Sequence, residues 1–136
     1  ELYEHPDNLF VAGFIGSPKM NFFEGVLEPG GLVRFAGTAI AAPFAAGAAA
    51  PGSAVTIGVR PEHFDREAAA DATIEVSVDF VEHLGGTSFV HGRVADGARV
   101  IIERRDAGDL KPGMAISAGF RGKDVRAFGE DGRRLR

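Results

Sequence analysis

The sequence contains no cysteine, so it can form neither disulfide bonds nor thiolate metal sites. This composition is typical of a reducing compartment. The chain also lacks an excess of basic residues, because 15 lysines and arginines are outnumbered by 19 aspartates and glutamates, for a net charge of −4. Since phosphate binding needs a basic face, the charge balance argues against nucleic acid as a partner.

Long apolar runs are missing as well. No stretch approaches the roughly 20 apolar residues of a membrane-spanning helix. Residues 1–16 lack the basic start and the small-residue cleavage site of a signal peptide. The chain starts at Glu1 rather than at a methionine, within a patterned segment, and we therefore expect it to be a piece of a longer protein. Its 136 residues fit one domain, or two small lobes that share a core.

Short alternating segments, separated by glycine, proline and aspartate, follow one another from residue 21 onward. The expected strands are 22–27, 32–35, 38–41, 54–59, 73–84, 88–94, 99–103, 114–120, 125–128 and 133–135. Pro29-Gly30 fits a type II turn, and Asp96-Gly97 is a two-residue hairpin signal. The pattern predicts a mainly β fold, either a small antiparallel barrel or a sandwich.

The strand expected at 73–84 has the clearest alternation. Ile74, Val76, Val78 and Phe80 are assigned to its core face, and the polar residues between them to solvent. Two successive apolar residues, Phe80 and Val81, interrupt the alternation, and this predicts a β-bulge there.

Three other segments are less regular. Residues 6–16 favour a short helix, with Pro6 in its first turn and Gly16 as its stop. Its apolar stripe fits either core packing or a partner. Residues 36–52, rich in alanine and glycine, are expected to form a loop after a short strand, and residues 65–71 a connector.

The segment Gly58–His63, with the sequence GVRPEH, ends the strand expected at 54–59. Arg60 precedes a proline and is therefore pushed toward extended backbone, and Pro61 lacks the donor that would continue a sheet ladder. The motif thus holds Arg60, Glu62 and His63 in a fixed place. Two interpretations remain open: a structural pair across a lobe boundary with Glu62 capping the next turn, or a contact with a subunit or regulator.

Patterns of known catalytic and metal sites are weak. Gly47–Ser53 has glycines at phosphate-loop spacing, but it lacks the lysine, and Pro51 removes a needed donor. Asp79 and Glu82 fit a solvated surface better than an acid/base pair, and no serine lies in a nucleophile elbow. The histidines show no zinc-binding spacing: His5, His63, His83 and His91. We expect no catalytic residue, metal or cofactor in this chain.

Five blocks together carry a family resemblance. They are Leu2-Tyr3 with Pro6, residues 10–22 (FVAGFIGSPKMNF), Gly58–His63, residues 81–85 (VEHLG) and residues 128–135 (FGEDGRRL). In this order they resemble the C-terminal region of ATP-binding subunits of ABC importers for sugars, of the maltose, oligosaccharide and glycerol-3-phosphate type. The tail of such subunits is a TOBE (transport-associated OB-fold) domain. Residues 36–52 and 65–72 carry no part of the resemblance.

The resemblance implies an OB-fold-like β-barrel at residues 19–136, with a lobe junction near 60–72, after a linker helix at 1–18 from a nucleotide-binding domain. It implies a regulatory and dimerisation domain without ATPase activity, with ATP and Mg²⁺ bound in that other domain. The implied partners are a second copy, permease subunits and a regulatory protein, at the cytoplasmic face of the membrane. The motif residues expected at an inter-lobe or regulatory contact are Gly58, Arg60, Pro61, Glu62 and His63.

Two departures from the family pattern bear on a rival interpretation. Ser17–Asn21 resembles the position of the Ser-Ala-Arg-Asn motif of related molybdate-binding domains, but Pro18-Lys19-Met20 replaces its interior, which argues against oxyanion binding. The closing motif usually follows His-Leu-Phe, and this chain has Arg126-Ala127-Phe128 instead. The rival, a small-ligand or oxyanion-binding OB-fold domain with its site near Arg60, stays open.

Overall fold

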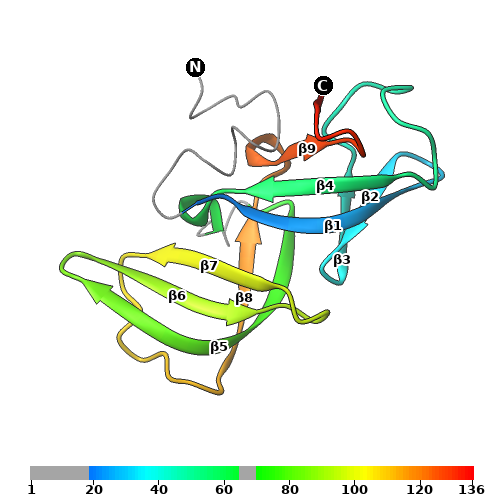
Figure 1. Cartoon of the computed structure of the whole chain (residues 1–136). Coiled ribbons are helices and arrows are strands. Elements are labelled where there is room, and N and C mark those ends of the chain that lie inside the picture. Colours follow the sequence, from blue (N-terminus) through cyan, green and yellow to red (C-terminus); the bar gives the residue numbers. More distant parts are fainter. Residues whose placement is uncertain (1–18, 65–69) are drawn as a thin grey trace.

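The computed structural model describes residues 19–64 and 70–136, which form two antiparallel sheets (Figure 1). The first sheet has six strands in the order β10-β9-β4-β1-β2-β3. Its strands are β1 (Asn21–Glu28), β2 (Leu32–Phe35), β3 (Thr38–Ala41), β4 (Ala54–Val59), β9 (Arg126–Phe128) and β10 (Arg134–Leu135). The chain leaves this sheet after β4 and returns to it only at β9.

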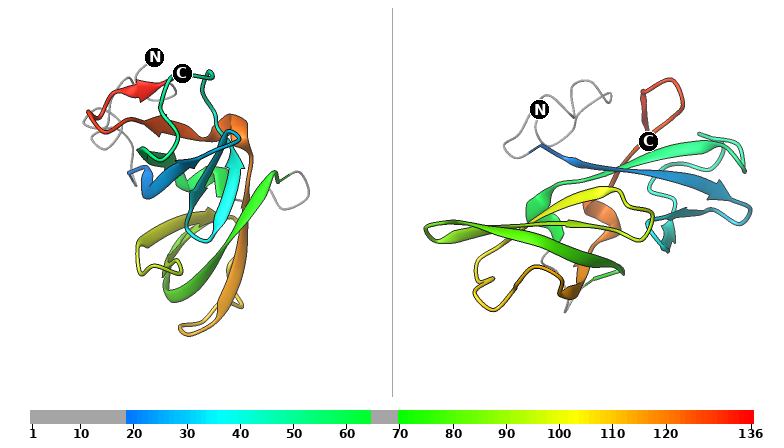
Figure 2. Two further views of the ribbon diagram at one scale, coloured as in Figure 1. Left: turned by 90° about the vertical axis from the view of Figure 1, so that its right-hand side faces the viewer. Right: turned by 60° about the horizontal axis from the view of Figure 1, so that its bottom comes forward.

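The second sheet has four strands in the order β7-β6-β5-β8. They are β5 (Ala72–Leu84), β6 (Thr87–Arg93), β7 (Arg99–Arg104) and β8 (Ala115–Phe120). Two short 3-10 helices are described, η1 (Pro61–Phe64) after β4 and η3 (Gly122–Asp124) after β8. Figure 2 shows β8 running from the second sheet up to the first. The predicted mainly β, OB-fold-like architecture is confirmed. The helix expected at 6–16 lies outside the described residues, as do residues 65–69 of the expected connector.

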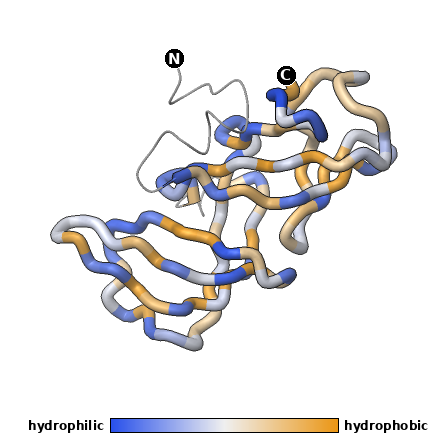
Figure 3. Tube along the Cα trace, viewed as in Figure 1, coloured by the Kyte–Doolittle hydropathy of each residue, from blue (hydrophilic) through white to orange (hydrophobic). Residues whose placement is uncertain are grey.

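Local sequence explains the strands and turns. Hydrophobic and hydrophilic residues alternate along the strands of the second sheet (Figure 3), and in β5 Ile74, Val76 and Val78 are buried while their neighbours are exposed. In the predicted type II turn, Gly30 has φ of 96° and the Gly31 N–H donates to the Glu28 carbonyl at 3.2 Å. That φ favours glycine, so the turn is encoded by the Pro-Gly pair.

The bulge in β5 lies one residue earlier than expected. Val78 pairs with Gly92 and Phe80 with His91, so Asp79 is the inserted residue. Placing Phe80 in the core was therefore wrong, since its side chain is 52% exposed. The insertion places two successive side chains, Asp79 and Phe80, on the same outer face. Gly92 permits the close approach of β5 here, because a Cβ at Gly92 would overlap the Ser77 carbonyl oxygen.

The two sheets share one hydrophobic core, and four phenylalanines form a ring at its centre. Phe23 and Phe35 come from the first sheet, Phe64 from η1 and Phe120 from β8 of the second sheet. Successive ring centroids are 5.7 to 6.3 Å apart. Aromatic pairs at this separation are favourable beyond their burial. Phe64 directly follows the GVRPEH motif, so the motif places one member of the ring.

Candidate functional site

The GVRPEH motif lies where the two sheets meet. β4 ends at Val59, and η1 packs against β7 and β8 of the second sheet. The Arg60 side chain is only 3% exposed, and the Arg60 carbonyl accepts a 3.0 Å hydrogen bond from the His63 N–H, which closes the turn. Pro61 is buried, while Glu62 and His63 are half-buried. The use of these residues as an inter-lobe or regulatory contact stays a prediction.

Gly58 is packed between neighbours on its own sheet. A Cβ there would overlap Met20 Sδ and lie 3.3 Å from Phe22 Cε1. Met20, Phe22 and Phe128 form a second, small apolar cluster on the side of β4 away from the main core. This cluster buries Gly58, which strand alternation assigned to the opposite face from Val55 and Ile57. The motif's glycine is therefore required by close packing.

Asn21 joins the two sheets through its side chain, and sequence reasoning missed this role. Its Nδ2 donates to the Ile101 carbonyl at 2.8 Å, and its Oδ1 accepts from the Ile101 N–H at 2.8 Å. Since β7 is an edge strand, these Ile101 groups lack a neighbouring strand, and the amide of Asn21 substitutes for a peptide group. The signal available in the sequence was an asparagine in the same alternation phase as Phe23 and Leu27, and the structure buries Asn21 to 7% exposure. We call Asn21, Arg60, Phe64 and Ile101 the inter-sheet joint.

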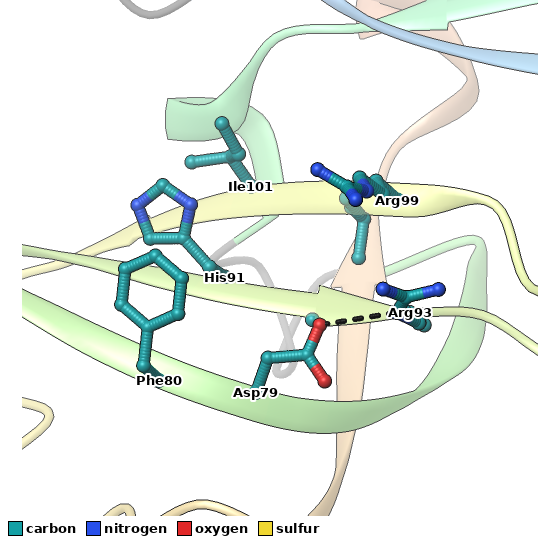
Figure 4. A pocket seen from close by; sticks show the side chains of 8 residues that line it. Asp79, Phe80, His91, Arg93, Arg99 and Ile101 are labelled. Carbon is teal, nitrogen blue, oxygen red and sulfur yellow. Dashed lines mark hydrogen bonds and ion pairs between the residues drawn. The ribbon is translucent and has the colours of Figure 1, made fainter.

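A depression of about 370 Å³ lies on the outer face of the second sheet. It is lined by Asp79, Phe80, His91, Gly92, Arg93, Arg99, Val100 and Ile101, from β5, β6 and β7. Figure 4 shows Phe80 and His91 on one side, and Asp79, Arg93 and Arg99 grouped on the other. The rings of Phe80 and His91 stack with centroids 4.2 Å apart and planes 9° apart. We call this the outer-face depression.

Its charges are only partly compensated. Arg93 and Arg99 lie directly opposite each other in the β6–β7 register, and Asp79 Oδ2 binds Arg93 Nε at 3.3 Å. Arg99 is exposed and makes no hydrogen bond or ion pair within the described part of the chain. Arg34 in the first sheet is different, because it binds Glu28 through two hydrogen bonds of 2.8 and 3.2 Å. The hydrogen bond from Arg34 lowers the pKa of Glu28 below its usual value.

The remaining candidates have ordinary polar partners. His83 Nδ1 lies 3.1 Å from Ser88 Oγ, and His91 Nε2 lies 3.2 Å from Glu82 Oε1, so the two histidines of this hairpin do not meet. Within residues 19–64 and 70–136 no group of three or more potential metal-binding side chains was found, and no helix is long and apolar enough to cross a membrane. His5 lies outside these ranges.

The glycine-rich stretch Gly47–Ser53 forms turns at the end of the first sheet. The Gly52 N–H donates to the Leu27 carbonyl at 2.6 Å, and the Leu27 N–H donates to the Ser53 carbonyl at 3.1 Å. The Ser53 N–H donates to the Ala50 carbonyl at 3.0 Å, so the N–H groups of Gly52 and Ser53 that a phosphate would need are already used. The stretch therefore acts as an extension of the sheet.

Comparison with known proteins gives two matching family models. The model described as the MalK OB fold domain matches residues 16–64, and the model described as the TOBE domain matches residues 57–128. The first covers β1 to β4 and η1, and the second runs from within β4 to the end of β9, so the two models overlap at the GVRPEH motif.

Three relatives have similar sequences. Lactose transport ATP-binding protein LacK of Rhizobium radiobacter is 43% identical over 99% of this chain and 39% of its own length. Maltose/maltodextrin import ATP-binding protein MalK of Vibrio cholerae is 37% identical over 100% of this chain and 38% of its own length. The sn-glycerol-3-phosphate import ATP-binding protein UgpC of Cereibacter sphaeroides is 39% identical over 75% of this chain and 28% of its own length. The chain thus spans about two fifths or less of these relatives.

A solved structure with the same fold is the cytoplasmic molybdate-binding protein ModG. It superposes with a TM-score of 0.59 over 79% of this chain and 94% of its own, at 18% sequence identity. At this identity the likeness supports the fold alone.

Proposed function

This chain belongs to the TOBE domain family, and we propose that it is the C-terminal regulatory and dimerisation domain of the ATP-binding subunit of an ABC importer for sugars or glycerol-3-phosphate. The observation that carries the proposal is the match over nearly the whole chain to ATP-binding proteins of lactose and maltose import, of which it spans about two fifths. A domain of a larger subunit accounts for both the high coverage of this chain and the low coverage of its relatives.

In this proposal the chemistry of transport belongs to other parts of the machinery. ATP and Mg²⁺ bind in a nucleotide-binding domain outside this sequence, so this chain by itself neither binds nor hydrolyses ATP. The parent subunit associates with permease subunits, which places the domain at the cytoplasmic face of the membrane. A second copy and a regulatory protein are its further partners, and nucleic acid is not one of them.

The domain acts by holding two subunits near each other. A lasting contact between two such tails raises the effective concentration of their catalytic domains for each other. A regulator that binds better to the separated arrangement shifts the population and slows transport. Glu62 and His63 are half-buried beside the inter-sheet joint. In this proposal the regulatory protein contacts these two residues and thereby senses the arrangement of the two sheets.

The first test is the size of the native polypeptide. Blotting source-cell extract with an antibody against this domain should give a band larger than the chain by a further domain of about 100–250 residues or more. A band at the size of this chain alone would contradict the proposal, because no catalytic domain would accompany it.

The second test concerns dimerisation of the purified parent subunit. Sedimentation velocity should show a dimer for the intact subunit and monomers when residues 19–136 are removed, while the shortened subunit retains ATP binding. The isolated 136-residue chain should show no ATP hydrolysis. An intact subunit that stays monomeric at high concentration would overturn the dimerisation part and leave the family assignment in place.

A further inference from the structure

We propose that the outer-face depression is a binding site for a small carboxylate carried on a ring. The guanidinium of Arg99 binds the carboxylate, and Phe80 contacts the ring. This inference concerns a site other than the GVRPEH motif and does not rest on the proposed transport function.

The charged side chains that line the depression favour binding of an anion. Arg93 and Arg99 are directly opposite each other across β6 and β7, and like charges in such a pair destabilise a sheet. Asp79 offsets Arg93 through one contact at 3.3 Å, and Arg99 has no partner within the described residues. The lining therefore carries two guanidinium groups against one carboxylate, in a chain whose net charge is −4.

The excess of one positive charge selects the kind of anion. Among the lining side chains a single added carboxylate balances the charge, whereas a phosphate dianion would add a further negative charge near Asp79 and near Glu82, which binds His91. A planar guanidinium also binds a carboxylate through two parallel hydrogen bonds, a geometry that adds specificity as well as strength.

The aromatic side of the depression selects the ring. Phe80 is half exposed because the bulge at Asp79 places both residues outward, and bulges commonly re-aim side chains beside binding sites. Its ring is held against His91, which is itself held by Glu82 at 3.2 Å. A pre-positioned aromatic surface next to a few polar groups is typical of small-molecule sites, and about 370 Å³ is room for one substituted ring.

The depression is also connected to the inter-sheet joint. Ile101 lines the depression, and its backbone carries the two hydrogen bonds to Asn21. A ligand there would contact β7 at the residue through which the first sheet holds the second. This gives a bound carboxylate a direct physical connection to the joint.

The test is an NMR titration of the full 136-residue chain with sodium benzoate, following the ring signals of Phe80 and His91. We expect saturable shifts confined to residues of the depression. Arg99→Gln should weaken binding by about tenfold, the loss expected for one charge-assisted interaction. Phe80→Ala should weaken it as well. Arg105→Gln, the same charge change at an exposed arginine just beyond β7, is the matched control and should leave the affinity unchanged.

Three further probes separate the parts of the proposal. Benzyl alcohol has the ring without the charge and acetate the charge without the ring, so both should bind more weakly than benzoate. Inorganic phosphate should also bind more weakly. The proposal is overturned if benzoate produces no saturable shift, or if Arg99→Gln binds as well as the parent. Phosphate binding tighter than benzoate would overturn the carboxylate assignment. None of these outcomes depends on transport, so they leave the proposed function to its own tests.

Discussion

Two regions of this molecule contain arginine and phenylalanine, and they use them in opposite ways. At the inter-sheet joint, Arg60 and Phe64 are 3% and 0% exposed and Phe64 packs in a ring of four aromatic side chains. In the outer-face depression, Arg99 is exposed without a partner in the described residues, and Phe80 is 52% exposed. The first region is closed around its own residues, and the second is open to a ligand.

This contrast in burial distinguishes the GVRPEH motif at the inter-sheet joint from the proposed binding surface in the outer-face depression. GVRPEH is the most recognisable stretch of the sequence, yet its central arginine is buried and its glycine, proline and following phenylalanine are packed against neighbours. The rival interpretation placed a ligand site near Arg60. Arg99, an exposed arginine without a partner in the described residues, lies on β7, outside the five sequence blocks quoted for the resemblance. In this chain the most recognisable motif thus consists largely of packed residues.

The largest expected difference between the two regions is in stability, when a phenylalanine of each region is replaced by alanine. Phe64→Ala should destabilise the fold by about 3–5 kcal/mol, since it opens a cavity between the two sheets. Phe80→Ala should cost about 0.5 kcal/mol or less, because this side chain is already half in water. Urea denaturation of both variants measures the difference. Equal losses would mean that Phe80 belongs to the core after all.

The joint itself is tested at Asn21. Asn21→Ala should cost about 2 kcal/mol, because it leaves the N–H and carbonyl of Ile101 without their partners. Asn21→Asp keeps the shape but places a carboxylate oxygen against the Ile101 carbonyl, so it should be no more stable than the alanine variant. Thermal or urea unfolding gives both values. A stable aspartate variant would show that shape, and not the paired hydrogen bonds, holds β7.

The smallest expected effect is at Arg99. Arg99→Glu replaces the opposed Arg93–Arg99 pair by an opposite-charge pair, and it should stabilise the fold by about 0.5 kcal/mol at low salt. Salt should remove this gain through screening. As a matched control, Arg34→Glu breaks the bonds to Glu28 and should shift stability in the other direction. Destabilisation by Arg99→Glu would indicate that the wild-type arginine has a structural partner.

Much of the fold follows from the sequence because its determinants are local. The strands expected at 32–35, 38–41 and 54–59 have those bounds in the structure, and the other strand ends differ by one residue at most. Alternation with period two and turns such as Pro29-Gly30 and Asp96-Gly97 act within a few residues. The family resemblance could also be recognised from the sequence, since each of its blocks is a short run of residues.

The candidate sites were much less predictable. The sequence singled out Gly58, Arg60, Pro61, Glu62 and His63, and their role as a contact stays a prediction. It did not indicate Asn21 as a link, because its partner Ile101 is 80 positions away. It also assigned Phe80 to the core. Moving the bulge by one residue reverses the face of a side chain, and alternation alone does not locate a bulge that precisely in register.

By itself, then, the sequence determined the strands, the tight turns, the family and the place where a strand must stop at Pro61. The tertiary structure alone decided how the edge strand β7 meets the first sheet, that the Asn21 amide bonds to its backbone, and that Arg99 faces solvent opposite Arg93 without a partner in the described chain. The physical reason is the range of each interaction. Backbone dihedrals and side-chain alternation are fixed by neighbours in the chain, whereas hydrogen bonding at a sheet edge and the burial of a side chain depend on surfaces contributed by distant segments.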